Sequence, residues 1–465
     1  MKNKYIDFIE QSFDFPQDEF KVTNQGLLSW HGIDLDALIQ EYGTPLKVCY
    51  LPKISENIQS AKQWFGEAMR EHNYSGKYYF SYCTKSSHFS HILDQALKNV
   101  IHIETSSAFD IEIVKRLHSD GKITEKTFIL CNGFKRDKYI ENIVSLINSG
   151  NFNCIPIIDN YEEIRLLSSK ATRKFNIGIR IASEEEPKFE FYTSRLGIGY
   201  KNIIPFYKEE IETNSGVQLK MLHFFINTGI KDNSYYWNEL QKCLSIYVEL
   251  KLICPTLDSL NIGGGFPIKD SLGFEYDYQY MVSEIILLIK TICDEAKVDV
   301  PDIFTEFGSF TVGESGAIFY EVLYQKQQND REKWNMINSS FITTLPDTWA
   351  INKRFIMLPL NHWDKSYERV LLGGLTCDSD DYYNNDQHVN TIYLPRFPLN
   401  KPLYIGFFNT GAYQDVLGGF GGLQHCLIPQ PKYILIDKTE QGDLFTSVFS
   451  EQQSSADFMK LLGYE

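Results

Sequence analysis

The sequence predicts a (β/α)8 barrel followed by an antiparallel β domain that the N-terminal segment completes. Short apolar runs alternate with longer amphipathic segments in the middle of the chain, which is typical of parallel βα units. Eight such runs favour a closed barrel over an open sheet. Beyond them, strand-like runs are separated by Pro, Gly, Asn and Asp. At 465 residues the chain exceeds one ordinary core. We therefore expect residues 1–50 to join the β domain, 51–320 to form the barrel and 321–465 to form the β domain.

The eight barrel strands are predicted from runs rich in Ile, Phe and other apolar residues, as expected for strands buried on both faces. These runs are 77–85, 101–107, 127–133, 153–159, 176–183, 220–229, 259–265 and 302–308. Helical periodicity lies between them, over 86–98, 108–119, 137–149, 160–170, 233–252 and 277–297.

The strands of the β domain are predicted from the pieces FIMLPL, ERVLLGGL, NTIYLP, PLYIGFF and YILID. Residues 454–463 are amphipathic and predict a short final helix.

Composition narrows the range of functions. The net charge of −15 argues against binding to nucleic acids or anionic membranes, which requires basic patches. No run approaches the about 20 apolar residues that span a bilayer, and the first residues lack the apolar core of a signal peptide. The nine cysteines are scattered without a CxxC pair, so neither a disulfide framework nor a zinc site is indicated. A reduced cytoplasm fits this pattern.

Polar residues end the predicted barrel strands, at the edge where α/β barrels carry their active sites. Lys85 closes the first strand, and its amine can form a Schiff base with an aldehyde once the neutral form is favoured. Glu306 ends the eighth strand, where a carboxylate could keep a pyridine nitrogen protonated. The alternatives are a salt bridge for Lys85 and a buried pair with an arginine for Glu306. His223 reads as an ordinary histidine near a strand end.

A second group of residues could hold a phosphate. Gly263, Gly264 and Gly265 let backbone N–H groups approach an anion closely, although a tight turn would also use glycine. Thr228 could add a hydroxyl donor. Tyr413, in a glycine-rich loop of the β domain, could hydrogen-bond a phosphate or cofactor.

The run Thr376-Cys-Asp-Ser-Asp-Asp381 lies in the β domain. Cys377 is a candidate proton donor, and the acids Asp378, Asp380 and Asp381 form an anionic patch that could bind a guanidinium or ammonium group. A solvated acidic loop is the alternative.

With these residues in place, the chain resembles the alanine-racemase-like (fold type III) decarboxylases that depend on pyridoxal 5′-phosphate (PLP). The family includes ornithine, diaminopimelate and arginine decarboxylases, and the resemblance spans nearly the whole chain. It is strongest to the biosynthetic arginine decarboxylases. The segments that carry it are ILCNGFKRDKYI (129–140), SSFITTLPDTWAI (339–351), GLTCDSDD (374–381) and GFFNTGAYQDVLGG (406–419).

The resemblance implies a role for each candidate residue. Lys85 would bind PLP covalently, and Glu306 would pair with the pyridine nitrogen. Cys377 would protonate the carbanion left by CO2 loss from across a dimer interface, and Asp378 with Asp380 would bind the distal guanidinium. The residues implied for the phosphate are Gly263, Gly264, Gly265, Thr228 and Tyr413.

Two positions depart from the family pattern. Phe225 stands where the family has a histidine that stacks on the PLP ring, and an aromatic ring can still stack there. Ser309 stands where the family has a phosphate-binding arginine. The absence of that arginine should weaken cofactor binding by about 1–3 kcal/mol. The cations that could substitute are Arg180, Lys188 and Arg195.

The resemblance implies PLP-dependent decarboxylation of a basic L-amino acid, foremost arginine to agmatine in polyamine biosynthesis. It also implies a cytoplasmic homodimer with shared active sites, or a larger oligomer. Ornithine, diaminopimelate and carboxynorspermidine decarboxylation are the alternatives within the enzyme class. Phe225 and Ser309 also motivate a non-catalytic homologue that regulates another decarboxylase. A barrel with an unrelated phosphate ligand is the third interpretation, and the use of a divalent ion is left open.

Overall fold

The computed structural model describes residues 18–184, 193–383, 392–398 and 400–464. It divides into two compact units. The barrel unit comprises Ile54–Pro267 and Tyr276–Thr311, and the sheet unit comprises Met1–Lys53, Ile268–Glu275 and Val312–Glu465. No helix within the described ranges is both long and apolar enough to cross a bilayer.

All eight predicted barrel strands are confirmed, and every pairing between them is parallel. The sheet closes because the last strand pairs with the first and the fourth pairs with the fifth. The strands are β5 (Tyr78–Cys83), β6 (His102–Thr105), β7 (Phe128–Cys131), β8 (Asn153–Ile158), β9 (Phe175–Ala182), β11 (Val217–His223), β12 (Ser259–Asn261) and β13 (Asp302–Phe307). The short strand β10 (Ile198–Gly199) pairs with β9.

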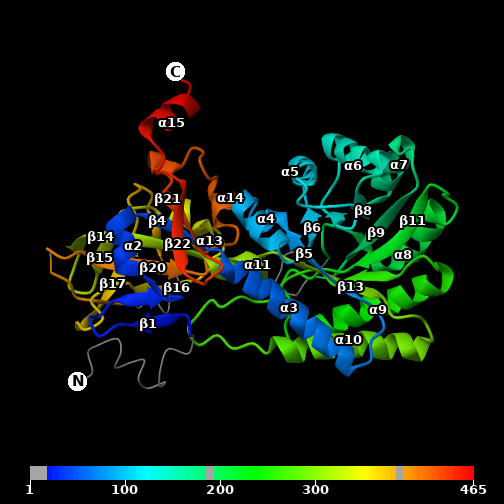
Figure 1. Cartoon of the computed structure of the whole chain (residues 1–465), viewed down its shortest axis with the longest axis horizontal. Helices are drawn as coiled ribbons and strands as arrows, with labels where there is room; N and C mark the ends of the chain where they lie inside the picture. The colour runs from blue at the N-terminus through cyan, green and yellow to red at the C-terminus, as the bar shows by residue number, and fades with distance from the viewer. Residues whose placement is uncertain (1–17, 185–192, 384–391, 399, 465) are drawn as a thin grey trace. The chain divides into compact units, whose positions relative to one another are not determined.

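Helices follow the strands as the sequence predicts, and α5, α6 and α7 flank β6, β8 and β9 in Figure 1. Asx and Ser side chains cap several of them by accepting hydrogen bonds from the first-turn N–H groups, as Ser107 and Asn160 do. The helices are α3 (Pro52–Glu71), α4 (Ser90–Leu97), α5 (Ala108–Ser119), α6 (Asp137–Ser149), α7 (Tyr161–Lys170), α8 (Tyr200–Phe206), α9 (Ser234–Ile253) and α10 (Tyr278–Ala296), with single turns at Thr84–Ser86 and Tyr207–Ile211.

The interior of the barrel is apolar at one end and polar at the other. At the N-terminal end, the rings of Tyr79, Phe128 and Phe304 pack with centroids 4.6–5.1 Å apart. Successive side chains of a strand alternate between its two faces, so Glu306 shares the inward face of β13 with Phe304. The aromatic layer therefore supports a polar layer at the C-terminal ends of the strands.

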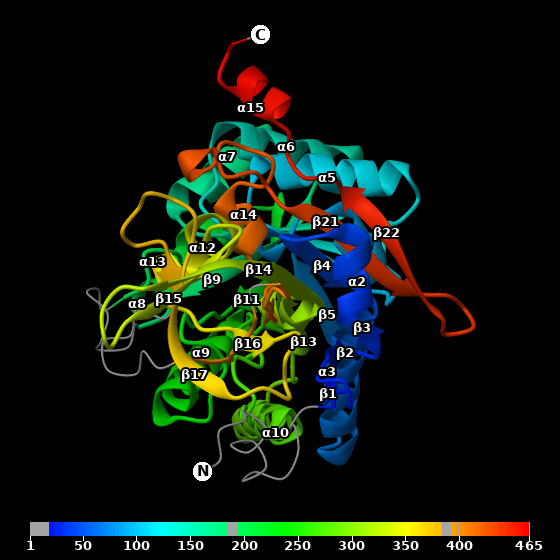
Figure 2. The ribbon, with the colours of Figure 1, turned by 90° about the vertical axis from the view of Figure 1, so that its left-hand side faces the viewer.

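The sheet unit is built around β14 (Gly316–Gln327), which pairs with β4 (Leu46–Tyr50), β15 (Lys333–Ile337) and β20 (Tyr404–Phe408). Strand β21 (Lys432–Lys438) lies against the other edge of β4, as Figure 2 shows. The remaining strands are β16 (Ile356–Pro359), β17 (Tyr367–Gly373), β18 (Tyr382–Tyr383), β19 (Ile392–Pro395) and β22 (Leu444–Ser450).

The predicted antiparallel arrangement holds for most pairs, but β4–β21 and β15–β17 are parallel. Neither pair is joined by a hairpin, so no turn imposes opposite directions. The sheet unit also includes residues 268–275 and 312–320, which fell inside the predicted barrel range 51–320.

Smaller elements complete the sheet unit. The short strands β1 (Phe20–Val22), β2 (Leu28–Trp30) and β3 (Ile33–Asp34) form a separate three-stranded sheet before helix α2 (Leu35–Tyr42). The predicted final helix is confirmed as α15 (Ser455–Leu461), which Ser454 caps. The short helices of this unit are α12 (Phe341–Thr344), α13 (Pro346–Ala350) and α14 (Gln414–Gly418), with single turns at Gly313–Ser315 and His425–Leu427. Helix α11 (Ser309–Val312) lies where the chain passes from the barrel unit to the sheet unit.

Candidate active site

Lys85 lies directly after β5, in a single helical turn rather than in the strand itself. Its side chain is 42% exposed, and its Nζ lies 3.1 and 3.2 Å from the two carboxylate oxygens of Glu104. Glu104 comes from the inward face of β6 and is fully buried. The salt bridge given as the alternative for Lys85 is therefore present, and it holds the amine over the polar end of the barrel.

Glu306 is almost fully buried, and its carboxylate is the centre of a hydrogen-bond network. Asn132 and Asn261 donate from their Nδ2 atoms to Glu306 Oε1, at 2.8 and 2.7 Å. Nε2 of His223 lies 3.1 Å from Oε2. These groups come from β13 and from the ends of β7, β11 and β12, so they meet inside the barrel. The partners are thus two amides and a histidine, instead of the arginine that the alternative interpretation named.

The network keeps Glu306 ionised. Burial by itself would raise the pKa of the Glu306 carboxyl, because a low-dielectric interior disfavours charge. The charge and hydrogen bond of His223, the charge of Lys85 and the hydrogen bond of Asn132 outweigh that effect and lower the pKa below its ordinary value. A permanent negative charge is therefore fixed at the polar end of the barrel.

Asn132 links the two buried carboxylates. Its Nδ2 atom donates to Glu104 at 3.0 Å and to Glu306 at 2.8 Å. One amide therefore connects the carboxylate that pairs with Lys85 to the carboxylate at the centre of the network. Asn132 lies in the segment 129–140, one of those on which the family resemblance rests.

The three glycines after β12 are each required by close backbone packing. A Cβ atom on Gly263 would lie 2.7 Å from the carbonyl oxygen of Phe224, and one on Gly264 would lie 2.1 Å from that of Glu306. A Cβ on Gly265 would lie 2.6 Å from the Cα atom of Gly229. The glycines are therefore needed for a tight turn, as the alternative interpretation held, and this turn packs closely against the strand that carries Glu306.

The same turn also presents backbone donors. The N–H group of Gly263 is bonded to Asn261 Oδ1 at 2.9 Å. The N–H groups of Gly264 and Gly265 make no hydrogen bond within the described residues, so they can bind an anion.

Buried polar atoms without a hydrogen-bond partner gather at this end of the barrel. Within the described part of the chain they include Asn132 Oδ1, Arg180 Nε, His223 Nδ1 and Thr228 Oγ1. Buried polar atoms are nearly always hydrogen-bonded in folded proteins. Orphaned donors and acceptors beside a glycine turn fit a polar, phosphorylated ligand such as PLP.

Phe225 is half-buried, and the guanidinium carbon of Arg180 lies 5.4 Å from its ring centroid. Arg180 is thus a cation inside the polar end of the barrel, where the charges of Glu306, Asp159 and Glu104 act on it. Of the other two candidate cations, Arg195 is exposed and Lys188 lies outside the described residues. Ser309, which stands at the family's arginine position, begins α11.

Tyr413 belongs to the sheet unit and precedes α14 with a φ of 67°. A bulky residue rarely adopts this left-handed conformation, and such strain is concentrated at functional sites. The strain adds to the case for Tyr413 as a functional residue.

The acidic run of the sheet unit divides into two parts. Cys377, Asp378 and Asp380 are exposed. Asp381 is buried, and its carboxylate accepts hydrogen bonds from the N–H of Phe341 at 2.8 Å and from Oγ1 of Thr376 at 2.7 Å. Asp381 therefore supports the loop, and only the first two acids are available to a ligand.

Seven of the predicted site residues lie in the barrel unit: Lys85, Phe225, Thr228, Gly263, Gly264, Gly265 and Glu306. The other four, Cys377, Asp378, Asp380 and Tyr413, belong to the sheet unit. Sequence reasoning missed Glu104 and Asn261, and it took His223, which contacts Glu306, for an ordinary histidine. The signal that could have found all three is the period of two, because each shares the inward face of its strand with the residue two positions earlier.

A sequence profile described as the pyridoxal-binding domain of pyridoxal-dependent decarboxylases matches residues 53–313. A biosynthetic arginine decarboxylase of Prochlorococcus marinus subsp. pastoris is 21% identical to the chain, over 93% of this chain and 85% of that protein. A second biosynthetic arginine decarboxylase, from Synechocystis, is 22% identical over 91% and 84%.

Solved structures share the fold. The biosynthetic arginine decarboxylase of Campylobacter jejuni superposes with a TM-score of 0.79, at 20% identity over 97% of this chain and 90% of that one. Diaminopimelate decarboxylase of M. jannaschii, solved with L-lysine, gives a TM-score of 0.77 at 18% identity over 96% and 98%.

Proposed function

The chain belongs to the pyridoxal-dependent decarboxylase family, and from this premise we propose that it removes the α-carboxylate of a basic L-amino acid, foremost L-arginine to give agmatine. Bound PLP supplies an electron sink for the electron pair of the broken Cα–carboxylate bond. The observation that carries the proposal is the polar end of the barrel, where Lys85 lies beside Glu104 and one amide connects Glu104 to the ionised Glu306.

Lys85 is the proposed point of cofactor attachment. Its amine must lose a proton before it can bond to an aldehyde carbon. The Glu104 carboxylate, at 3.1 Å, is positioned to accept that proton and to orient the side chain.

Glu306 is the proposed partner of the pyridine nitrogen. Its charge is maintained by His223, and its orientation is fixed by the two amide donors. A fixed carboxylate favours the protonated ring, which withdraws electrons better than the neutral one.

The proposed phosphate site combines the N–H groups of Gly264 and Gly265 with the hydroxyl of Thr228, whose Oγ1 has no partner within the described residues. Gly263 shapes the turn, and Tyr413 is the proposed further donor. We propose that one face of the Phe225 ring stacks on the cofactor ring, because Arg180 lies over the other face. Arg180 is the proposed source of the positive charge that the family's phosphate-binding arginine, replaced here by Ser309, would supply.

We propose a cytoplasmic homodimer in which Cys377, Asp378 and Asp380 act on the barrel of a second copy. The thiol of Cys377 would protonate the carbanion, and the carboxylates would accept hydrogen bonds from the distal guanidinium. The exposure of all three side chains supports this arrangement, because they are available to another copy. A monomer would then be inactive.

Arginine is favoured over the other basic amino acids by the relatives named biosynthetic arginine decarboxylase. The two exposed acids also favour a fully cationic distal group. Ornithine, diaminopimelate and carboxynorspermidine are the alternative substrates.

The test is CO2 release from L-arginine, L-ornithine, L-lysine and meso-diaminopimelate in separate assays with added PLP. Release from arginine alone, lost in Lys85→Ala and strongly reduced in Cys377→Ala, is the expected result. Release from a different substrate would refute the arginine assignment. The absorbance of lysine-bound PLP without any CO2 release would favour the regulatory homologue that Phe225 and Ser309 suggest.

A further inference from the structure

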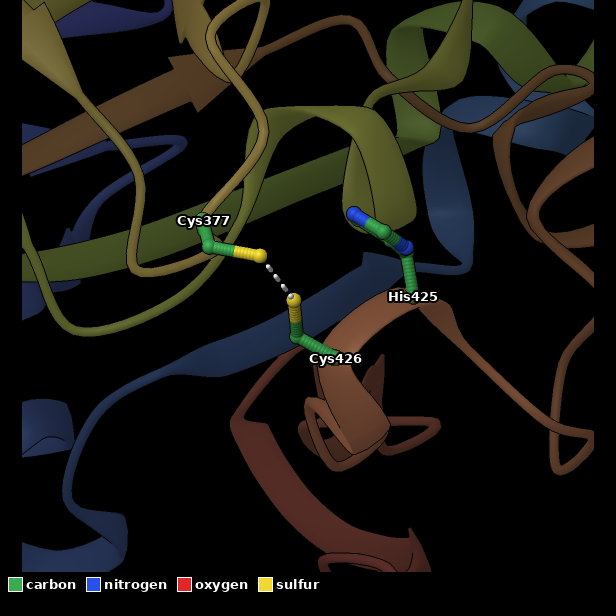
Figure 3. A group of neighbouring side chains, drawn as sticks. All are labelled: Cys377, His425 and Cys426. Carbon is green, nitrogen blue, oxygen red and sulfur yellow. Dashed lines mark hydrogen bonds between the residues drawn. The ribbon is translucent and has the colours of Figure 1, made fainter.

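Three exposed metal-ligand side chains converge in the sheet unit, as Figure 3 shows. Cys377 follows β17, whereas His425 and Cys426 lie in the single turn His425–Leu427. The two sulfur atoms are 3.4 Å apart although the residues are 49 positions apart in sequence. One donor atom from each of the three residues lies within 4.8 Å of the other two.

We propose that Cys377, His425 and Cys426 bind a thiophilic divalent cation of the Zn²⁺ class. Thiolate and imidazole are the ligands that such cations prefer, and three protein ligands with one open position are typical of non-structural zinc sites. Bond lengths of about 2.3 Å to sulfur and about 2.0 Å to nitrogen place tetrahedral ligands roughly 3.5–3.8 Å apart. The two sulfur atoms, 3.4 Å apart, are already near that spacing, and a ring nitrogen of the exposed His425 lies within 4.8 Å of both.

The surroundings of the cluster favour a cation. Asp378 Oδ2 lies 3.6 Å from His425 Nε2 and adds negative charge beside the cluster. Cys426 and Leu427 have φ angles of 55° and 52°, a conformation that non-glycine residues seldom adopt. This strained turn presents the imidazole and the thiol of adjacent residues to Cys377 together. A disulfide would use the two sulfurs alone and would give His425 no part.

Binding exchanges protons for the metal. Each thiol loses its proton to solvent as its sulfur bonds to the cation, so one divalent cation releases two protons when both thiols start protonated. The affinity for the cation should therefore increase with pH.

The cluster has a consequence that rests on the proposed function. Cys377 is the proposed proton donor and Asp378 the proposed guanidinium ligand. A bound cation would hold the sulfur of Cys377 and lie beside Asp378, so it would inhibit decarboxylation reversibly. A chelator should restore activity.

The test uses the reduced, full-length protein without substrate. Zn²⁺ is titrated against a chromophoric chelator, and Co²⁺ is added separately to record thiolate-to-cobalt absorbance. We expect one equivalent per chain, and an affinity at least about 10-fold weaker in Cys426→Ser and in His425→Ala. His118→Ala, on helix α5 of the barrel unit, is the matched control and should bind as the wild type does.

Equal Zn²⁺ affinity in wild type and both variants would overturn the proposal, as would a Co²⁺ spectrum without thiolate bands. Conversion of both thiols to a disulfide in the presence of Zn²⁺ would also overturn it. An activity arm separates this inference from the proposed function: Cys426→Ser should keep the metal-free activity but lose inhibition by Zn²⁺. Metal binding without any decarboxylation would refute only the proposed function.

Discussion

Replacement of Glu306 by Gln removes the buried charge with little change of shape. Both amide donors, from Asn132 and Asn261, reach the same oxygen, Oε1. The glutamine carbonyl should therefore take that position, and its NH2 group should face Nε2 of His223. His223 can accept this hydrogen bond only when its ring proton is on Nδ1, which has no partner within the described residues.

The expected loss of stability is small. A hydrogen bond to a charged acceptor contributes about 1.5–3 kcal/mol and a neutral one about 0.5–1.5 kcal/mol, so the changes at Asn132, Asn261 and His223 together cost about 3–4.5 kcal/mol. The lower cost of burying an amide instead of a carboxylate offsets part of this. We expect a net loss within about 2 kcal/mol. The expected loss of kcat is about 10²–10³-fold, the usual effect of removing one fixed electrostatic group from an active site.

The assay is CO2 release under PLP saturation, with urea unfolding measured in parallel. PLP attachment, followed by absorbance, should persist because Lys85 is untouched. Glu239→Gln is the matched control, since Glu239 is equally buried but pairs with Lys242. It should lose stability and retain kcat. A Glu306→Gln enzyme with kcat within about threefold of wild type would refute the assigned role.

The remaining predictions concern pH and packing. Burial would raise the pKa of the Glu306 carboxyl, but His223 and its other partners lower it in the folded protein. The ionised carboxylate therefore stabilises the fold above the pKa of unfolded glutamate, about 4.3, and this stabilisation is lost as the pH falls through the lower pKa of the folded state. The stability difference between wild type and Glu306→Gln, from urea unfolding at a series of pH values, should shrink only below about pH 4.3; a difference that shrinks at neutral pH would contradict this. Gly264→Ala places a Cβ 2.1 Å from a carbonyl oxygen and should cost at least about 1–3 kcal/mol in urea unfolding, whereas Gly273→Ala meets nothing within 4 Å and should cost far less. Lys135→Met removes the ammonium that pairs with the buried carboxylate of Glu163, which keeps only hydrogen bonds, and should cost about 3–5 kcal/mol in thermal unfolding. The exposed Arg165→Ala should cost about 0–1 kcal/mol.

Much of the fold could be predicted because the barrel depends on local patterns. Apolar runs placed all eight strands, and helical periodicity placed helices between them. The parallel pairs β4–β21 and β15–β17 could not be predicted, because pairing between distant strands depends on the packing of the whole sheet. The sequence contains no turn that would reveal them.

Sequence reasoning found one part of the site and missed the residues that this part contacts. Lys85, Glu306 and the glycine turn all stand at ends, where polar residues are conspicuous. Glu104 and Asn261 also lie near the ends of their strands, but their importance appears only when the closed barrel brings them to Lys85 and Glu306. The partnership of Cys377 with Cys426 is likewise a product of tertiary structure.

The position of β4 has a consequence for the order in which the chain assembles. β4, made of residues 46–50, has β14 on one side and β21, made of residues 432–438, on the other. During synthesis from the N-terminus, both edges of β4 stay uncovered until β14 is made, and one stays uncovered until β21 leaves the ribosome. The barrel strands, complete by residue 307, can close long before that. A nascent chain stalled before β21 should therefore present a folded barrel and an open strand edge, the kind of surface that chaperones bind and that aggregation begins from.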